Sequence, residues 1–229
     1  MDATVLVTGG TGGLGSAVTE TFLAHGWRVV LPSRARRDRD APQKRARLEL
    51  VDADLLDPGA VGRAVDAAAS DGRTPLRAVV NLVGGYAGGT PLHETSPEEF
   101  ERLLTLNLRP TFLVTRAALP HLLDGGGAIV CVSARAAVQP FGGAAAYITA
   151  KAAVLAFAQA VAAEYRNRGI RCNAVLPSVI DTPANRAAQP DADHSRWVAP
   201  AEIASVIRFL CSDESAPTSG AAIPVYGRA

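Results

Sequence analysis

A glycine-rich turn constrains this chain more than any other feature. Residues 8–15 read TGGTGGLG and lie between an apolar run, residues 3–7, and a helical pattern over residues 14–25. Glycines permit a tight strand-to-helix turn and let the backbone approach a pyrophosphate closely. The helix that follows offers free N–H groups and the positive end of its dipole to an anion. The turn therefore predicts a phosphate-binding site for a nucleotide cofactor.

Strand-like and helix-like segments alternate along the rest of the 229 residues. This alternation indicates one α/β domain, in which helices cover both faces of a parallel sheet. We expect strands over residues 3–7, 27–31, 47–51, 77–82, 128–133 and 221–225, and helices over 14–25, 58–69, 97–123, 147–166 and 200–211.

Composition points to a small-molecule partner. The 23 basic and 22 acidic side chains give no overall field for nucleic acid or an anionic membrane. Cys131, Cys172 and Cys211 are far apart and lack neighbours at ligand spacing, so we expect buried thiols, with no metal site and no disulfide. The first strand leaves no room for a signal peptide, and the apolar stretch 152–163 is too short to span a bilayer. We therefore expect a cytoplasmic protein.

The end of the second strand bears on cofactor choice. An acid that binds the adenosine ribose is expected about twenty residues beyond the glycines, but Ser33 and Arg34 stand there. Arg34, with Arg36 or Arg37 nearby, can bind a 2′-phosphate, which favours NADP(H) and leaves NAD(H) possible. The alternative is that the basic segment 34–47 is only a solvated crossover.

Polar residues and glycines close the next strands. Asp54, with Leu55 beside it, could accept from an adenine amino group, although a loop or capping role for acids here is equally open. Asn81 and Gly84 end the fourth strand, where glycine would let the backbone pass under a ribose. Asn107 is a poor helix former inside a helical pattern, and it either turns its amide toward the site or lies on a partly exposed face.

Tyr147 and Lys151 stand four residues apart near the start of an alanine-rich helical pattern. Residues at this spacing share one helix face, so the phenol and the ammonium are neighbours. The positive charge is expected to lower the phenol pKa from about 10 toward neutrality. A phenol with such a pKa can donate or accept a proton at working pH.

Together these motifs resemble the short-chain dehydrogenase/reductase family over essentially the whole chain. Asn173 to Pro177 and Thr182 add to the likeness. The resemblance implies a Rossmann-type doubly wound sheet of about seven strands, hydride transfer with a nicotinamide cofactor, and a homodimer or homotetramer. It makes Tyr147 the acid/base, places Lys151 on the nicotinamide ribose and gives Asn107 a proton relay through water. The expected cofactor-binding residues are Gly9, Thr11, Gly13, Leu14, Gly15, Ser33, Arg34, Asp54, Leu55, Asn81, Gly84, Tyr147, Lys151, Pro177, Val179 and Thr182.

One family residue is missing. The substrate-binding serine normally lies thirteen residues before the tyrosine, where this chain has Ala134. Ser133 is one place early, and it can substitute only if the strand breaks its pleat, because successive strand residues face opposite sides. Several segments are similar to the quinonoid dihydropteridine reductase branch, which also has alanine here. That branch has an aspartate suited to NADH at the end of strand two, where this chain has Ser33 and Arg34, so pteridine reduction remains an alternative.

The segment from about 181 to 198 is a long irregular excursion and a candidate substrate loop. We expect Tyr86, Ala134, Asn185 and Trp197 to contact the substrate, with a packing role as the alternative. His93, His121 and His194 are expected on the surface. A different class of function also stays open, namely a binding protein that senses the cofactor and lost its chemistry with the serine.

Overall fold

The computed structural model describes residues 3–34 and 46–228. Seven strands form one parallel sheet in the order β3-β2-β1-β4-β5-β6-β7. This order reverses between β1 and β4, which confirms the Rossmann-type doubly wound sheet. The strands are β1 (Thr4–Thr8), β2 (Arg28–Ser33), β3 (Leu48–Asp52), β4 (Leu76–Asn81), β5 (Gly127–Val132), β6 (Ile170–Pro177) and β7 (Ala222–Val225).

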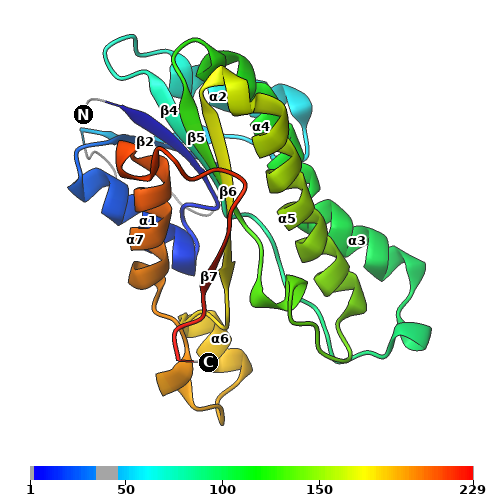
Figure 1. The fold of residues 1–229 in the computed structure, drawn as a ribbon. Helices are drawn as coiled ribbons and strands as arrows, with labels where there is room; N and C mark the ends of the chain where they lie inside the picture. Colours follow the sequence, from blue (N-terminus) through cyan, green and yellow to red (C-terminus); the bar gives the residue numbers. More distant parts are fainter. Residues whose placement is uncertain (1–2, 35–45, 229) are drawn as a thin grey trace.

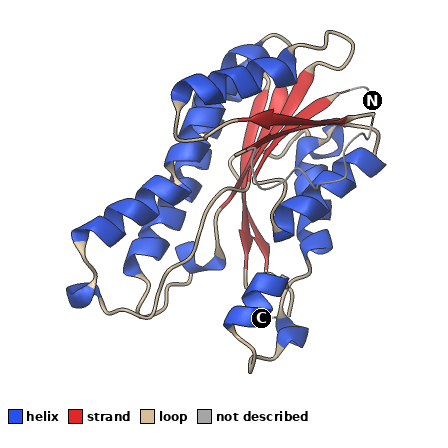
Figure 2. Cartoon of the chain, turned by 180° about the vertical axis from the view of Figure 1, so that it is seen from behind, coloured by secondary structure: helices blue, strands red, loops and turns tan. Residues whose placement is uncertain are grey.

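Helices cover both faces of the sheet, as Figures 1 and 2 show. One face carries α1 and α7, and the other carries α2, α4 and α5, with α3 packed on α5. The helices are α1 (Gly13–Ala24), α2 (Pro58–Ala69), α3 (Pro97–Asn107), α4 (Arg109–Leu123), α5 (Ala145–Tyr165), α6 (Pro183–Ala188) and α7 (Pro200–Cys211).

Alternation along the strands builds two cores. Leu6 and Val79 face α2, α4 and α5, whereas their neighbours Val5 and Val80 face α1 and α7. Successive side chains of a strand point to opposite faces, so a strand covered on both sides is apolar throughout. All three cysteines are buried, as expected.

The helix expected over residues 97–123 is in fact two helices. Ser96 caps α3 by accepting from the Glu99 N–H at 3.2 Å, which confirms the expected start. The break falls at Leu108, because Pro110 has no N–H for the helical ladder and belongs in the first turn of a new helix. Pro120 lies inside α4 and does not end it.

Helix α5 is long and apolar enough, with the turn that follows it, to cross a membrane by length and composition alone. The sequence expectation counted only residues 152–163, but the alanines at the helix start extend the apolar stretch. This helix packs on α3 and β6, and its Lys151 is buried.

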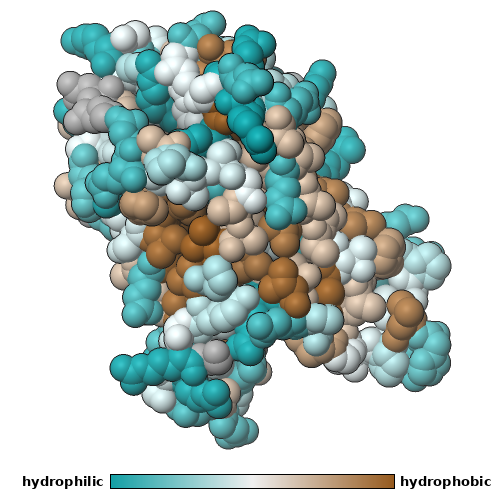
Figure 3. Space-filling view, in the orientation of Figure 1, coloured by the Kyte–Doolittle hydropathy of each residue, from teal (hydrophilic) through white to brown (hydrophobic). Residues whose placement is uncertain are grey.

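The excursion over residues 181–198 contains α6 and a single 3-10 turn, His194–Arg196. Its two ends are joined at the base by a parallel bridge between Ile180 and Val198. The Asp181 N–H donates to the Val198 carbonyl at 2.9 Å, and the Val198 N–H donates to the Val179 carbonyl at 3.0 Å. Residues 181–198 together form the α6 lobe. This lobe projects beyond the carboxyl end of β6, and on the face shown in Figure 3 it is mostly hydrophilic.

Candidate functional site

A cavity of about 630 Å³ lies at the carboxyl ends of β1, β2 and β3. Six residues expected to bind the cofactor line it: Gly9, Thr11, Ser33, Arg34, Asp54 and Leu55. The remaining lining residues, which sequence reasoning missed, are Pro32, Ala53, Leu56, Val83, Leu106 and Pro110. Four of these adjoin expected residues in the chain or close the β4 turn, but nothing in the sequence indicates that the break between α3 and α4 reaches this cavity.

The glycine turn forms one wall of this cavity. Gly9 has φ +67°, a conformation that glycine adopts without strain. A Cβ on Gly15 would collide with the Gly9 carbonyl oxygen, so the helix can approach the turn only without a side chain there. The backbone thus forms the cradle that a pyrophosphate at a helix N-terminus requires, and the residues present fit a dinucleotide.

Thr182 lies directly over the turn, although it is far away in the sequence. A Cβ on Gly13 would come within 2.8 Å of the Thr182 methyl carbon. The same threonine caps α6, since its hydroxyl accepts from the Asn185 N–H at 3.2 Å. The structure therefore brings two expected cofactor-binding residues together and places α6 at the edge of the turn.

The two acids after β3 have separate tasks. Asp57 caps α2 by accepting from the N–H groups of Gly59 and Ala60. Asp54 accepts from the Leu56 N–H at 3.0 Å while it lines the cavity. A carboxylate has further acceptor sites, so a bond to an adenine amino group remains open to Asp54.

Lys151, Asn107 and Gly84 meet at the end of β4. A Cβ on Gly84 would lie 2.5 Å from Asn107 Oδ1 and 2.9 Å from Lys151 Nζ. The Lys151 ammonium donates to the Val132 carbonyl at 3.1 Å. The Asn107 amide accepts from the Gly85 N–H and donates to the Gly85 and Leu103 carbonyls, so its side chain fixes the β4 turn.

Tyr147 requires a correction. Burial raises its pKa to about 12, and the neighbouring Tyr86 phenol adds to this increase. Burial also lowers the pKa of Lys151 to about 8. The expected lowering of the phenol pKa is therefore wrong for this structure, because loss of solvent is the largest influence on the phenol and raises its pKa.

Ser133 does not take the place of the missing serine by reversing the strand. Ala134 continues the extended conformation, with φ −158° and ψ 156°, so the pleat is unbroken. The Ser133 hydroxyl is buried and donates to the Lys151 carbonyl at 2.7 Å. Val132 and Ser133 therefore hold Lys151 at both ends, by its ammonium and by its backbone, while Ala134 contributes only a methyl group.

The Asn81 side chain is buried and is not among the residues that line the cavity. Its Nδ2 donates to the Thr115 hydroxyl at 3.1 Å, and its Oδ1 has no partner among the described residues. Asn81 lies directly opposite Thr8 where the strand order reverses. The hydrogen bond between the Asn81 and Thr115 side chains joins β4 to α4.

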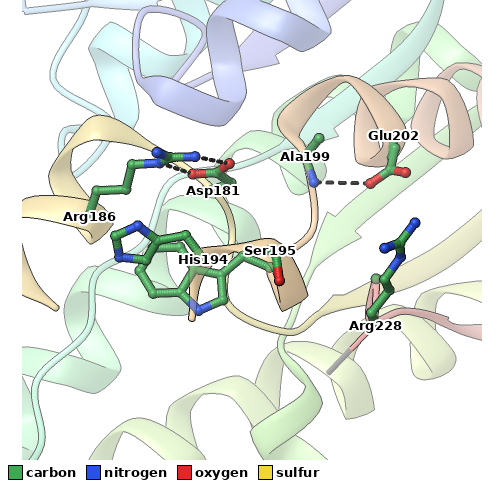
Figure 4. Close-up of a pocket in the computed structure, with 9 residues that line it drawn as sticks. Asp181, Arg186, His194, Ser195, Ala199, Glu202 and Arg228 are labelled. Carbon is green, nitrogen blue, oxygen red and sulfur yellow. Dashed lines mark hydrogen bonds and ion pairs between the residues drawn. The ribbon is translucent and has the colours of Figure 1, made fainter. Parts of the chain in front are cut away.

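Two expected substrate residues lie in the α6 lobe. Asn185 donates to the Ile180 carbonyl at 2.8 Å and so braces α6. Trp197 packs against His194, with ring centroids 4.3 Å apart. Both side chains line a second cavity of about 740 Å³, between the α6 lobe and the C-terminal residues Gly227 and Arg228. Figure 4 shows the Asp181–Arg186 ion pair, at 2.5 and 2.8 Å, on the wall of this cavity. His194 was expected on the surface and is half-buried here.

Comparisons with known proteins extend over the whole chain. A family model described as enoyl-(acyl carrier protein) reductase matches residues 9–227. The 2-(R)-hydroxypropyl-CoM dehydrogenase of Xanthobacter autotrophicus is 34% identical over 99% of this chain and 98% of its own length. The D-threitol dehydrogenase of Mycolicibacterium smegmatis is 31% identical over 97% of this chain and 90% of its own length.

Solved structures also match essentially the whole chain. A short-chain type dehydrogenase/reductase from Mycobacterium ulcerans superposes with a TM-score of 0.91 at 27% identity and covers 100% of this chain and 90% of its own. The 3-ketoacyl-(acyl-carrier-protein) reductase from Brucella melitensis, complexed with NADH, gives a TM-score of 0.88 at 27% identity, over 99% of this chain and 98% of its own.

Proposed function

The chain belongs to the short-chain dehydrogenase/reductase family of nicotinamide-dependent oxidoreductases, and from this premise we propose that it uses NADPH to reduce a small carbonyl compound or a conjugated imine. The observation that carries the proposal is the meeting of Asn107, from α3, and Lys151 at Gly84, because Lys151 lies on α5, the helix that also carries Tyr147. The adjoining 630 Å³ cavity is the place for the adenosine half of the cofactor.

The hydride and the proton of the reduction come from different groups. A bound reduced nicotinamide supplies hydride, and Tyr147 supplies the proton to the substrate oxygen or nitrogen. Because burial raises its pKa to about 12, Tyr147 is protonated at neutral pH and holds the proton that reduction needs. Lys151, held in place by Val132 and Ser133, is the nearby cation that stabilises the phenolate left behind.

Arg34 supports the preference for NADPH. It lies exposed at the carboxyl end of β2 and lines the adenosine cavity, where its guanidinium is available to a 2′-phosphate. Arg36 and Arg37, which were expected to assist, lie outside the described residues. The Brucella reductase structure holds NADH, so NAD(H) stays a possible cofactor for this fold.

The second candidate is a dihydropteridine-type reduction of a conjugated imine. Ala134 favours it, because a conjugated, electron-poor substrate accepts hydride with less help in polarising its acceptor atom. The reported relatives are instead named as alcohol dehydrogenases and an oxoacyl reductase. A carbonyl substrate is therefore the first choice.

Replacement of Tyr147 by phenylalanine tests the proposal. We expect Tyr147→Phe to lower kcat by roughly a factor of 10² to 10⁴, because the proton donor is lost, while NADPH still binds. NADPH oxidation across a panel of ketones, quinones and pterins gives the rate, and fluorescence titration gives the dissociation constant. Tyr165→Phe, at the other end of α5, is the matched control and keeps full activity.

Undiminished turnover in Tyr147→Phe would contradict the assignment of the acid. Tight NADPH binding by the wild type, with no oxidation on any member of the panel, would favour the cofactor-sensing binding protein instead. The two outcomes are distinct, since the first requires an active wild type and the second an inactive one.

We further propose a homodimer or homotetramer in the cytoplasm. Phe112 on α4 is 45% exposed and packs edge-to-face on Phe157 of α5, with ring centroids 6.3 Å apart. We expect a second copy to cover these two rings, which lie on neighbouring helices, because aromatic side chains are enriched at subunit interfaces. Sedimentation velocity measures the subunit number directly.

A further inference from the structure

Tyr86 is an exposed aromatic side chain beside the proposed acid. Its ring packs edge-to-face on Tyr147, with centroids 5.0 Å apart and planes at 81°. The Tyr86 side chain is nevertheless 62% exposed. An aromatic ring that touches the reacting phenol and keeps most of its surface in solvent offers a flat apolar surface to whatever occupies the site.

Two glycine-rich loops hold this ring in place. A Cβ on Gly88 would collide with the Tyr86 hydroxyl and lie 3.3 Å from the Ala144 Cβ, so the ring in this position lies closely over Gly88. The Gly89 N–H donates to the Gly143 carbonyl at 2.7 Å, which ties the β4 loop to the segment before α5. Both of these glycines have positive φ, +99° and +80°. The ring is therefore held at its hydroxyl end and at Tyr147, while the rest of it stays open.

The segments around the ring carry no charge. Residues 82–92 and 136–147 contain no Asp, Glu, Lys, Arg or His. Two of the large exposed apolar side chains in these segments are Val138 and Phe141, at 48% and 51%. The Ser133 hydroxyl donates its hydrogen bond to the Lys151 carbonyl, and the Ala134 side chain has no hydrogen-bond donor. These two segments therefore offer a ligand shape and apolar contact rather than charged partners.

We propose that Tyr86 is the specificity-determining residue of this site and that it selects substrates whose carbonyl or imine is attached to a flat, uncharged, conjugated ring. This inference rests on the proposed function and narrows its substrate class. The substrate ring covers the open part of Tyr86 while its acceptor atom meets Tyr147. Two aromatic rings that pack together gain free energy beyond that of apolar burial alone. A puckered saturated ring lacks this additional gain.

A matched pair of ketones tests the inference. 1-Tetralone and 1-decalone share one carbon skeleton, but only the first has an aromatic ring next to the carbonyl. The readout is the ratio of kcat/KM for the two ketones with NADPH, in the wild type, Tyr86→Phe and Tyr86→Leu. Intrinsic differences in carbonyl reactivity cancel when this ratio is compared between variants.

We expect Tyr86→Leu to lower the tetralone-to-decalone ratio roughly 3- to 10-fold, the gain typical of an aromatic pair. Tyr86→Phe keeps the ring and keeps the ratio. An unchanged ratio in Tyr86→Leu would overturn the inference. So would a fall in Tyr86→Phe as large as that in Tyr86→Leu, since it would assign the effect to the hydroxyl.

A binding measurement separates this inference from the proposed function. Titration calorimetry gives the dissociation constants of both ketones for Tyr147→Phe saturated with NADPH, with and without Tyr86→Leu. A preference for 1-tetralone that Tyr86→Leu abolishes supports the inference even if no ketone is turned over. Equal affinities in both backgrounds overturn it even if Tyr147 proves to be the acid.

Discussion

At the residue scale, we propose that cofactor choice depends on Arg34, which lines the cavity at the end of β2. We predict that Arg34→Glu raises the KM for NADPH about 10- to 100-fold, the effect of losing a charge-assisted hydrogen bond to a phosphate, and leaves the KM for NADH within about 2-fold. Steady-state kinetics with both cofactors measures this. Arg73→Glu is the control, because Arg73 is exposed just before the amino end of β4, whereas the cavity lies at the carboxyl ends of the strands. Equal losses for NADPH and NADH would contradict the assigned role.

Individual residues show how far the sequence predicts this site. The glycine turn, the strand ends and Arg34 were foreseen, because strand-end positions in a parallel sheet follow from the order of the elements. Leu106 and Pro110 were not, since they reach the cavity only through the break at Leu108. The pKa of Tyr147 was predicted in the wrong direction, because spacing reveals a neighbouring charge and does not reveal loss of solvent.

At the scale of elements, one buried bond ties α5 to the end of β5. Ser133→Ala removes the hydroxyl bond to the Lys151 carbonyl, and we expect it to lower the free energy of unfolding by about 1 kcal/mol. Ser205→Ala removes a similar bond, 3.0 Å to the Ala201 carbonyl, from an exposed position, and we expect little change. Guanidinium unfolding measures both variants. Equal effects would mean that burial of the Ser133 bond has no consequence for stability.

Most expected helices and strands start and end within about two residues of the predicted positions, but no range was predicted for β6 or α6. Pro58–Ala69 and Pro200–Cys211 match the expected ranges at both ends. The expected helix over residues 97–123 failed at one point, because a proline in a helical pattern can bend a helix or begin a new one. Periodicity alone does not distinguish these two outcomes.

At the scale of the whole molecule, the buried Lys151 couples stability to pH. Burial lowers its pKa to about 8 from an ordinary value of 10.5. Between these values the unfolded chain binds a proton that the folded chain does not, so the free energy of unfolding rises with pH, by up to about 1.4 kcal/mol per pH unit. The cost of burying the charge is present in full below pH 8 and disappears as pH rises through this window.

Guanidinium unfolding of the wild type and Lys151→Met between pH 7.5 and 9.5 measures this contribution. We expect the wild type to gain stability relative to the variant as pH rises, because methionine cannot titrate. The range stops below pH 10, because the pKa of Tyr147 is raised above its ordinary value of 10. Above that pH, the folded chain keeps a proton that the unfolded chain loses, and the free energy of unfolding falls. Parallel curves for the two proteins would contradict the prediction.

The bridge between Ile180 and Val198 has a consequence for how this molecule can diverge. The bridge joins the two backbone segments at the base of the α6 lobe. The seventeen residues between Ile180 and Val198 therefore form a closed loop whose two attachment points stay fixed. Insertions, deletions or replacement of the residues after Thr182, which itself packs on Gly13 of the glycine turn, would leave the register of β6 and β7 unaltered. New ligand preferences can therefore arise by exchanging those residues, with the phosphate cradle and the proton donor inherited intact.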